Sequence, residues 1–375
     1  MLKRVIVALS LMALVGAALP APARAAFDRR AMLRHLAEAI IIPAFREFDA
    51  AANELDSAVK AFAAAPNRNT LQAAQSAWVA AFLAWNRCEL YAFRRLVPLF
   101  NQINKWPMNP KLVEGFIENA PIIDDRFIEG LGSTSRGLPA LEYFLFDPIG
   151  GPDAVLSALQ APRRMAYLTG LANNLRIKAD AALKIWLPEG GNYAEAFINA
   201  DMEAGDVNGS VAMLTNQIVI LLENIILQKV FKPLGTGEIG GTMPELAQAA
   251  RSGQSLAAIG ANVASIRLAF NGGEGIGLDD YVDSLGVLID GQTLSARFNA
   301  ALDKLVGLLN APAFGNRLSP LGATVTADPF TFALVNDPAV VTALWAQARQ
   351  TLRIFKTEVA ANLGVLTLFT DGDGD

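Results

Sequence analysis

Residues 70–96 read TLQAAQSAWVAAFLAWNRCELYAFRRL, and this stretch decides the fold class. Apolar residues recur every three or four positions, at Leu71, Ala74, Trp78, Phe82 and Trp85. That spacing places them on one face of an α-helix, since an α-helix has 3.6 residues per turn. The stretch therefore predicts a long helix with an aromatic face turned toward a core.

The same helical period recurs through most of the chain. Helices are expected at 33–62, with a kink at Pro43, and at 154–187, 207–231, 255–270, 293–309 and 337–363, while 97–136 should hold only short helical pieces. Alternation typical of strands is scarce. The sequence predicts an all-α protein of two helical bundles, each resembling a four-helix bundle, with a cleft between them.

The break between the two bundles is expected at Pro188-Glu189-Gly190-Gly191, the clearest interruption of the helical pattern. The predicted domains are 26–190 and 191–375. The two halves have similar lengths and similar numbers of expected helices, which would suit an ancient duplication.

The N-terminus is typical of a signal peptide. Lys3 and Arg4 precede the apolar run 5–19, and Ala23-Arg24-Ala25 follows as a small-x-small cleavage site. A run of this length is short for a membrane span. We therefore expect cleavage after residue 25, export to the periplasm, and no membrane-spanning segment in the mature chain.

Composition excludes several classes of protein. The chain of 375 residues has 31 Lys+Arg and 36 Asp+Glu, so its net charge of -5 does not favour binding to nucleic acid. It has one Cys and one His, too few for an internal disulfide or a two-His zinc site. Any bound metal would need carboxylate ligands, and Cys88 is expected in the core.

Two carboxylates fall on apolar helix faces. Glu142 is the only ionisable carboxylate in the run 138–146, and Glu89 continues the aromatic face of 70–96 by one turn. A buried carboxylate requires a partner, such as an arginine, a metal ion or a shared proton. The alternative for Glu142 is an ion pair with arginine that joins two helices. Arg87 is expected to be a solvated charge.

Two other groups of polar residues are weaker candidates. His35 and Glu38 have a spacing that could place both on one metal ion, but they are expected on a solvated helix face. The terminal Asp371-Gly372-Asp373-Gly374-Asp375 resembles the start of a calcium loop, but the later ligands of such a loop are missing. A frayed acidic tail is the expected structure.

The stretch Gly137-Leu138-Pro139-Ala140-Leu141-Glu142-Tyr143 resembles the signature of the imelysin family, Gly-x-His-x-x-Glu followed by aromatic and apolar residues. The remaining points of resemblance follow the family's order along the chain: the tryptophan-rich helix, Lys105-Trp106-Pro107, Pro244-Glu245-Leu246, Arg251-Ser252-Gly253 with Ser255, and Leu363-Gly364-Val365 before Phe369 and the acidic end. The resemblance covers nearly the whole mature chain. It differs at one position, because Pro139 stands where the family has His.

The resemblance implies a periplasmic or surface protein of two helical bundles, with the motif near the cleft. It also implies a link to iron uptake and a proposed metallopeptidase activity with the family's His and Glu as metal ligands. Gly137 is expected to allow a tight turn into the motif helix, and Tyr143 and Trp106 are expected to line the cleft. Glu142 and Glu89, with Asp279 or Asp280, could hold iron or another hard ion through oxygen ligands.

Three functions remain open at this point. The first is a non-enzymatic periplasmic binding protein for iron, another metal, haem or an envelope iron-acquisition protein. The second is a metallopeptidase, which the missing His disfavours, because catalytic zinc usually needs three protein ligands. The third is an envelope interaction scaffold that no longer binds metal.

Overall fold

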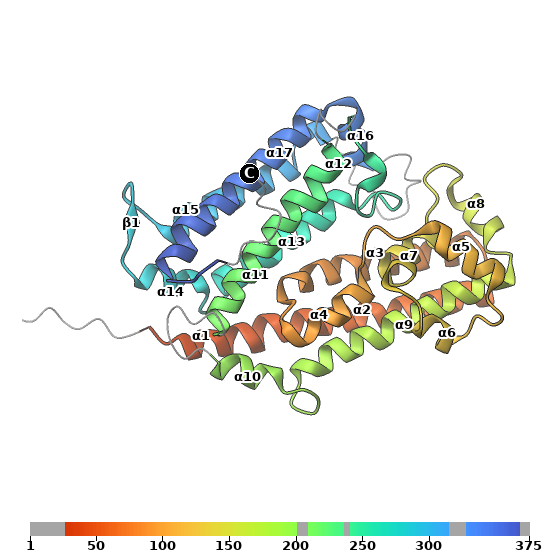
Figure 1. Ribbon diagram of the computed structural model, residues 1–375, viewed down its shortest axis with the longest axis horizontal. Helices are drawn as coiled ribbons and strands as arrows, with labels where there is room; N and C mark the ends of the chain where they lie inside the picture. The colour runs from red at the N-terminus through yellow and green to blue at the C-terminus, as the bar shows by residue number, and fades with distance from the viewer. Residues whose placement is uncertain (1–26, 201–208, 236–240, 315–327, 368–375) are drawn as a thin grey trace, which may run out of the picture.

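The computed structural model describes residues 27–200, 209–235, 241–314 and 328–367. Over these residues the fold is all-α, as predicted, and the described strands are one short hairpin, β1 (Leu288–Ile289) paired antiparallel with β2 (Gln292–Thr293). The long helices form two groups, drawn in Figure 1 as a lower layer and an upper layer.

The lower group is built on three long helical segments. The segment that runs through α1 (Arg29–His35), η1 (Leu36–Ile41) and α2 (Ile42–Ala64) packs against both α3 (Arg68–Cys88) and α9 (Pro162–Trp186). Shorter elements cover one side of it: η2 (Glu89–Tyr91), η3 (Arg94–Leu96), α4 (Val97–Ile103), α5 (Pro110–Asn119), α6 (Asp125–Glu129), η4 (Ser133–Ser135), α7 (Gly137–Leu145) and α8 (Gly151–Ala158).

The upper group contains the C-terminal helices. Its long members are α11 (Ser210–Asn224) continued by η5 (Ile225–Phe231) and α12 (Lys232–Leu234), α13 (Ser255–Asn271), α15 (Leu294–Leu309), and α17 (Pro338–Ile354) continued by η8 (Phe355–Ala360). The smaller elements are η6 (Pro244–Leu246), α14 (Leu278–Ser284), η7 (Pro312–Phe314) and α16 (Pro329–Asn336). The short helix α10 (Tyr193–Asn199) precedes them in the chain and lies in the lower layer of Figure 1, where it packs on α1, η1 and α9.

Local sequence explains where the longest helices begin and bend. Asn67 and Thr70 form a capping box that starts α3, each side chain accepting a hydrogen bond from the other residue's backbone N–H. The expected kink at Pro43 takes the form of a π-helical turn, η1, immediately before it. A widened turn accommodates the proline, which has no N–H for an internal hydrogen bond.

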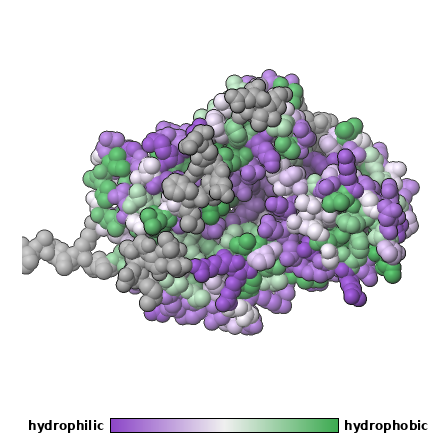
Figure 2. Space-filling view, in the orientation of Figure 1, coloured by the Kyte–Doolittle hydropathy of each residue, from purple (hydrophilic) through white to green (hydrophobic). Residues whose placement is uncertain are grey.

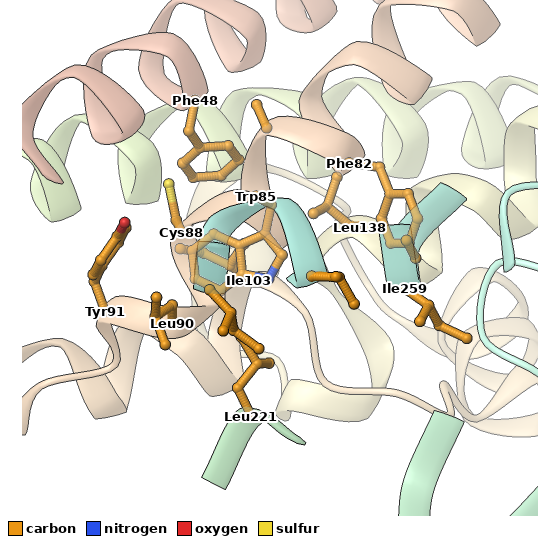
Figure 3. Packing of buried hydrophobic residues seen from close by; sticks show 14 of the residues in the cluster. Phe48, Phe82, Trp85, Cys88, Leu90, Tyr91, Ile103, Leu138, Leu221 and Ile259 are labelled. Atoms are coloured by element: carbon orange, nitrogen blue, oxygen red, sulfur yellow. The ribbon is translucent and has the colours of Figure 1, made fainter. Parts of the chain in front are cut away.

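One apolar core runs through both groups. Figure 3 shows Trp85 of α3 at its centre, with Leu138 of α7, Leu221 of α11 and Ile259 of α13 nearby. All four side chains are at most 4% exposed, as is Cys88, which was expected in the core. Because α13 packs directly on α3, the two groups share this core. The predicted division at residue 190 stays a prediction.

One described helical segment, Ser210–Leu234, is long and apolar enough to cross a membrane by length and composition. However, 72% of its apolar window is buried inside the protein, as in the core helix of a bundle. The predicted signal peptide and the acidic C-terminal residues lie outside the described residues. Figure 2 shows hydrophilic residues over much of the face it displays, with smaller hydrophobic patches among them.

Candidate functional site

The site begins at Gly137, the first residue of α7. Gly137 has φ +76°, and a Cβ atom there would lie 2.3 Å from the carbonyl oxygen of Ile103 at the end of α4. Only glycine fits a left-handed backbone this close to another chain segment. This backbone conformation is the kind of tight turn that was expected at Gly137. Pro139 follows in the first helical turn, where the missing N–H has no intrahelical partner to lose.

Glu142 is buried, as predicted, with 6% of the residue exposed. Its partner is Ser252, in the loop 247–254 between η6 and α13. The Ser252 backbone N–H and hydroxyl both lie 2.8 Å from Glu142 Oε1 and donate to it. The motif helix α7 of the lower group is thus hydrogen-bonded to a loop of the upper group. The partner of Glu142 is the uncharged Ser252, and not an arginine.

Burial raises the pKa of Glu142 from 4.5 to about 7. The Ser252 hydrogen bonds and the charge of Arg251 act in the opposite direction, while the nearby Asp328 carboxyl raises the pKa further. Desolvation disfavours the charged form, and two hydrogen bonds to one oxygen do not fully offset it. At neutral pH a large fraction of Glu142 is therefore protonated.

Loop 247–254 contacts further groups on both of its sides. The Arg251 Nε donates to the Phe146 carbonyl oxygen at 3.0 Å, and the Arg251 guanidinium lies 5.0 Å from the centre of the Tyr143 ring. The Ser255 N–H lies 3.3 Å from Asp328 Oδ1, and burial raises the pKa of Asp328 to about 6. Ser252 in the loop and Ser255 at the start of α13 are therefore each hydrogen-bonded to a buried carboxyl group.

The aromatic residues expected at the cleft are both half-buried. The Tyr143 hydroxyl donates to Glu114 Oε1 at 2.6 Å, and Glu114 also accepts from Arg164 at 2.5 Å. Trp106 lies in the segment between α4 and α5. Among the described residues, the side-chain hydrogen bonds of Glu142 come from Ser252 and not from Tyr143 or Trp106.

Glu89 belongs to a different buried network. Its Oε2 atom lies 2.9 Å from Lys229 Nζ of η5, and the two side chains are 16% and 5% exposed. Lys229 also donates to Asn86 Oδ1 at 2.9 Å and to Asn262 Oδ1 at 2.6 Å. Asn262 and Asn104 each donate to the Glu89 carboxylate at 2.9 Å. The Lys229 ammonium group thus has three acceptors for its three hydrogens. The network joins η5 to α3 and α13.

The predicted oxygen-ligand metal site needs correction. The Glu89 carboxylate is bound by an ammonium group and two amides, whereas Glu142 is bound by Ser252. Asp279 and Asp280 lie on α14, at the opposite end of the molecule from α7 in Figure 1. Within the described ranges, no three His, Cys, Asp or Glu side chains are grouped so that they could hold a metal ion. The side chains around Glu142 and Glu89 therefore do not fit a metal ion.

His35 was also placed incorrectly. It is half-buried, and its Nε2 donates to the Gly272 carbonyl oxygen at 2.8 Å, in a loop of the upper group. Glu38 is exposed as expected and pairs with Arg34. Arg87, expected to be solvated, pairs with Glu47. The helical spacing identified the apolar face of 33–62 correctly, but a loop more than 200 residues later covers part of its polar face.

Lys229 and Asp328 are site residues that the sequence did not single out, and Ser252 was named only as part of the family resemblance, without a role. Lys229 was detectable, because it is one of few charges in an otherwise apolar helix, by the same criterion that identified Glu142. Ser252 and Asp328 lie outside regular helical patterns. Only the folded chain brings them to α7 and to Ser255.

The fold and this site define a class of all-α protein. In it, a short helix of one helical group carries a buried carboxyl, here Glu142 of α7. A loop of the other group, here 247–254, donates hydrogen bonds to that carboxyl. The family model named Imelysin matches residues 41–351. The chain belongs to the imelysin family, as its motif indicated. No curated protein matches the sequence significantly.

Two solved structures have similar folds. One is from Parabacteroides distasonis, and its name describes an iron-regulated protein A precursor. Its TM-score is 0.66 and its sequence identity is 20%. The match covers 88% of this chain and 94% of that chain. The other is an imelysin-like protein from Psychrobacter arcticum, also with a TM-score of 0.66 and 20% identity, over 91% and 96%. At this identity the likeness shows the fold.

Proposed function

We propose that this protein is an exported, non-enzymatic binding protein of the periplasm that acts in iron acquisition. Export is supported by the signal-like residues 1–25 and by the precursor named among the similar structures. The link to iron is supported by the iron-regulated protein of the same fold. The binding role would be carried by the shape and surface of the folded chain, without a metal ion at the motif.

The observation that carries this proposal is the contact between Glu142 and Ser252. A catalytic metal needs an ionised carboxylate, further ligands and a position open to water. Glu142 instead accepts two hydrogen bonds at one oxygen and has a raised pKa, while Pro139 offers no donor atom. In this chain the motif carboxyl holds loop 247–254 against α7.

The two alternative functions, a metallopeptidase and an interaction scaffold, require different sites. A metallopeptidase would need ligands that the described donor set does not supply at Glu142. An interaction scaffold would use only a protein partner, and it would share the structural role of Glu142 that we propose. The scaffold differs from a binding protein in having no saturable ligand.

The test uses the mature protein recovered from the periplasm, titrated calorimetrically with ferric and zinc ions and assayed for peptide cleavage with and without chelator. We expect the wild type and Glu142→Gln to give the same metal isotherms, with no chelator-sensitive cleavage. The matched Pro139→His variant restores the family residue and shows whether the assay detects a regained ligand. One metal equivalent that binds wild type and is lost in Glu142→Gln would contradict the proposal.

A further inference from the structure

A cavity of about 860 Å³ lies between the segment α11–η5 and the segment α17–η8, separate from Glu142. Its volume is within the range of small-molecule sites in proteins. Its apolar wall includes Leu227 and Leu352 together with the rings of Phe231 and Trp345, which are stacked with centroids 5.4 Å apart. An aromatic surface of this kind suits a flat hydrocarbon body.

The rim of this cavity is basic. Arg349, Arg353 and Lys356 follow Trp345 along one face of α17 and η8, at helical spacing, and all line the cavity. Lys356 pairs with the buried Glu223 at 2.6 Å. Neither arginine has a carboxylate partner among the described residues: Arg349 lies 4.7 Å from the centre of the Trp345 ring, and Arg353 donates to Gln350. Within the described ranges, these two guanidinium groups therefore have no carboxylate counter-ion.

The helix geometry at this cavity is unusual. Both walls contain π-helical turns, η5 and η8. Pro233 follows η5 as Pro43 follows η1, whereas η8 has no such proline, and π-helical turns are frequent at functional sites. Ion pairs hold η8 on two sides, because Lys356 bonds to Glu223 of α11 and Glu358 bonds through both oxygens to Arg297 of α15. These ion pairs fix the position of η8 beside the cavity.

We propose that this cavity binds a small carboxylate with a flat aromatic or otherwise apolar body. The hydrocarbon body lies against Phe231, Leu227 and Trp345, and the carboxylate accepts hydrogen bonds from Arg349 and Arg353. Guanidinium groups suit this role because their planar donors match the two oxygens of a carboxylate. The inference goes beyond the proposed function, and it does not depend on whether Glu142 binds a metal.

The test compares pyrene-1-butyrate with its neutral analogue pyrene-1-butanol, using the mature protein and the pyrene fluorescence. We expect the acid to bind about tenfold more tightly than the alcohol, as charge-assisted hydrogen bonds of this kind require. The variant Arg349→Gln/Arg353→Gln should remove that difference and leave alcohol binding unchanged. Trp345→Ala should weaken both probes.

Both arginines are exposed, so their substitution should not unfold the protein, which circular dichroism would check. The control is Arg267→Gln, an arginine on α13 that pairs with Asp303 and does not line the cavity. It should leave both affinities unchanged. Equal affinity for acid and alcohol, unchanged acid binding in the double variant, or no binding of the acid at millimolar concentration would overturn the proposal.

Discussion

The variant Gly137→Ala is expected to lose about 4 kcal/mol of folding free energy, because a left-handed alanine costs about 1–2 kcal/mol and the added methyl group overlaps a backbone carbonyl. The overlap is severe, since the new Cβ would lie 2.3 Å from the Ile103 oxygen and 2.7 Å from the Gln102 oxygen. These carbonyls end α4 and can move only if that helix shifts. Urea denaturation of the purified variant measures the loss.

The control for this variant is Gly132→Ala. Gly132 precedes η4 with φ -63°, and a Cβ atom there meets nothing within 4 Å. Its substitution should change stability by less than about 1 kcal/mol. A Gly137→Ala protein as stable as the Gly132→Ala protein would show that the turn into α7 is not constrained as described.

Lys229→Met is expected to destabilise the protein by about 3–5 kcal/mol, because it leaves a buried carboxylate without its counter-ion. Methionine has a similar length and preserves packing, so the loss reports the missing ammonium group. Glu89 would keep two amide donors, from Asn104 and Asn262, but no positive charge. The measurement is again the free energy of unfolding in urea.

Two further variants make this result specific. Lys232→Met changes an exposed lysine on the same helical segment and should have an effect within about 0.5 kcal/mol. Adding Glu89→Gln to Lys229→Met should recover part of the lost stability, because the unpaired charge is removed. A double variant less stable than Lys229→Met alone would contradict the ion-pair description of this network.

The fold class was predictable from sequence because the helical period is strong and directly visible. The aromatic face of 70–96 became α3, and the helix expected at 255–270 became α13 within a residue. Glu142 was also predictable, since a carboxylate within an apolar run has few ways to reach water. These inferences depend only on residues close together in the chain.

The partners of those residues were not predictable in the same way. The separation between Glu142 and Ser252 is 110 residues, and Lys229 lies 140 residues from Glu89. No periodic pattern specifies which loop covers which helix face. The same limit led to the incorrect grouping of Asp279 and Asp280 with Glu142, since only the fold places α14 and α7 at opposite ends.

Glu142 is a buried hydrogen-bonding group whose protonated form is stabilised by the fold. A folded-state pKa raised from 4.5 to about 7 means that the folded protein binds the proton more tightly than the unfolded chain. The resulting stability is present below the unfolded pKa of 4.5 and is lost as the pH rises through about 7. A shift of this size corresponds to about 3 kcal/mol. Glutamine has no proton to lose at this position.

The most direct measurement is therefore the free energy of unfolding of the wild type and Glu142→Gln from about pH 4 to about pH 8, the range spanning both pKa values. Glu118→Gln, on the exposed side of α5, controls for the loss of one charge. We expect wild-type stability to fall by about 3 kcal/mol relative to Glu142→Gln across this range. A wild type that gains stability relative to Glu142→Gln as the pH rises would show that the ionised carboxylate is the stabilised form, and would contradict the account.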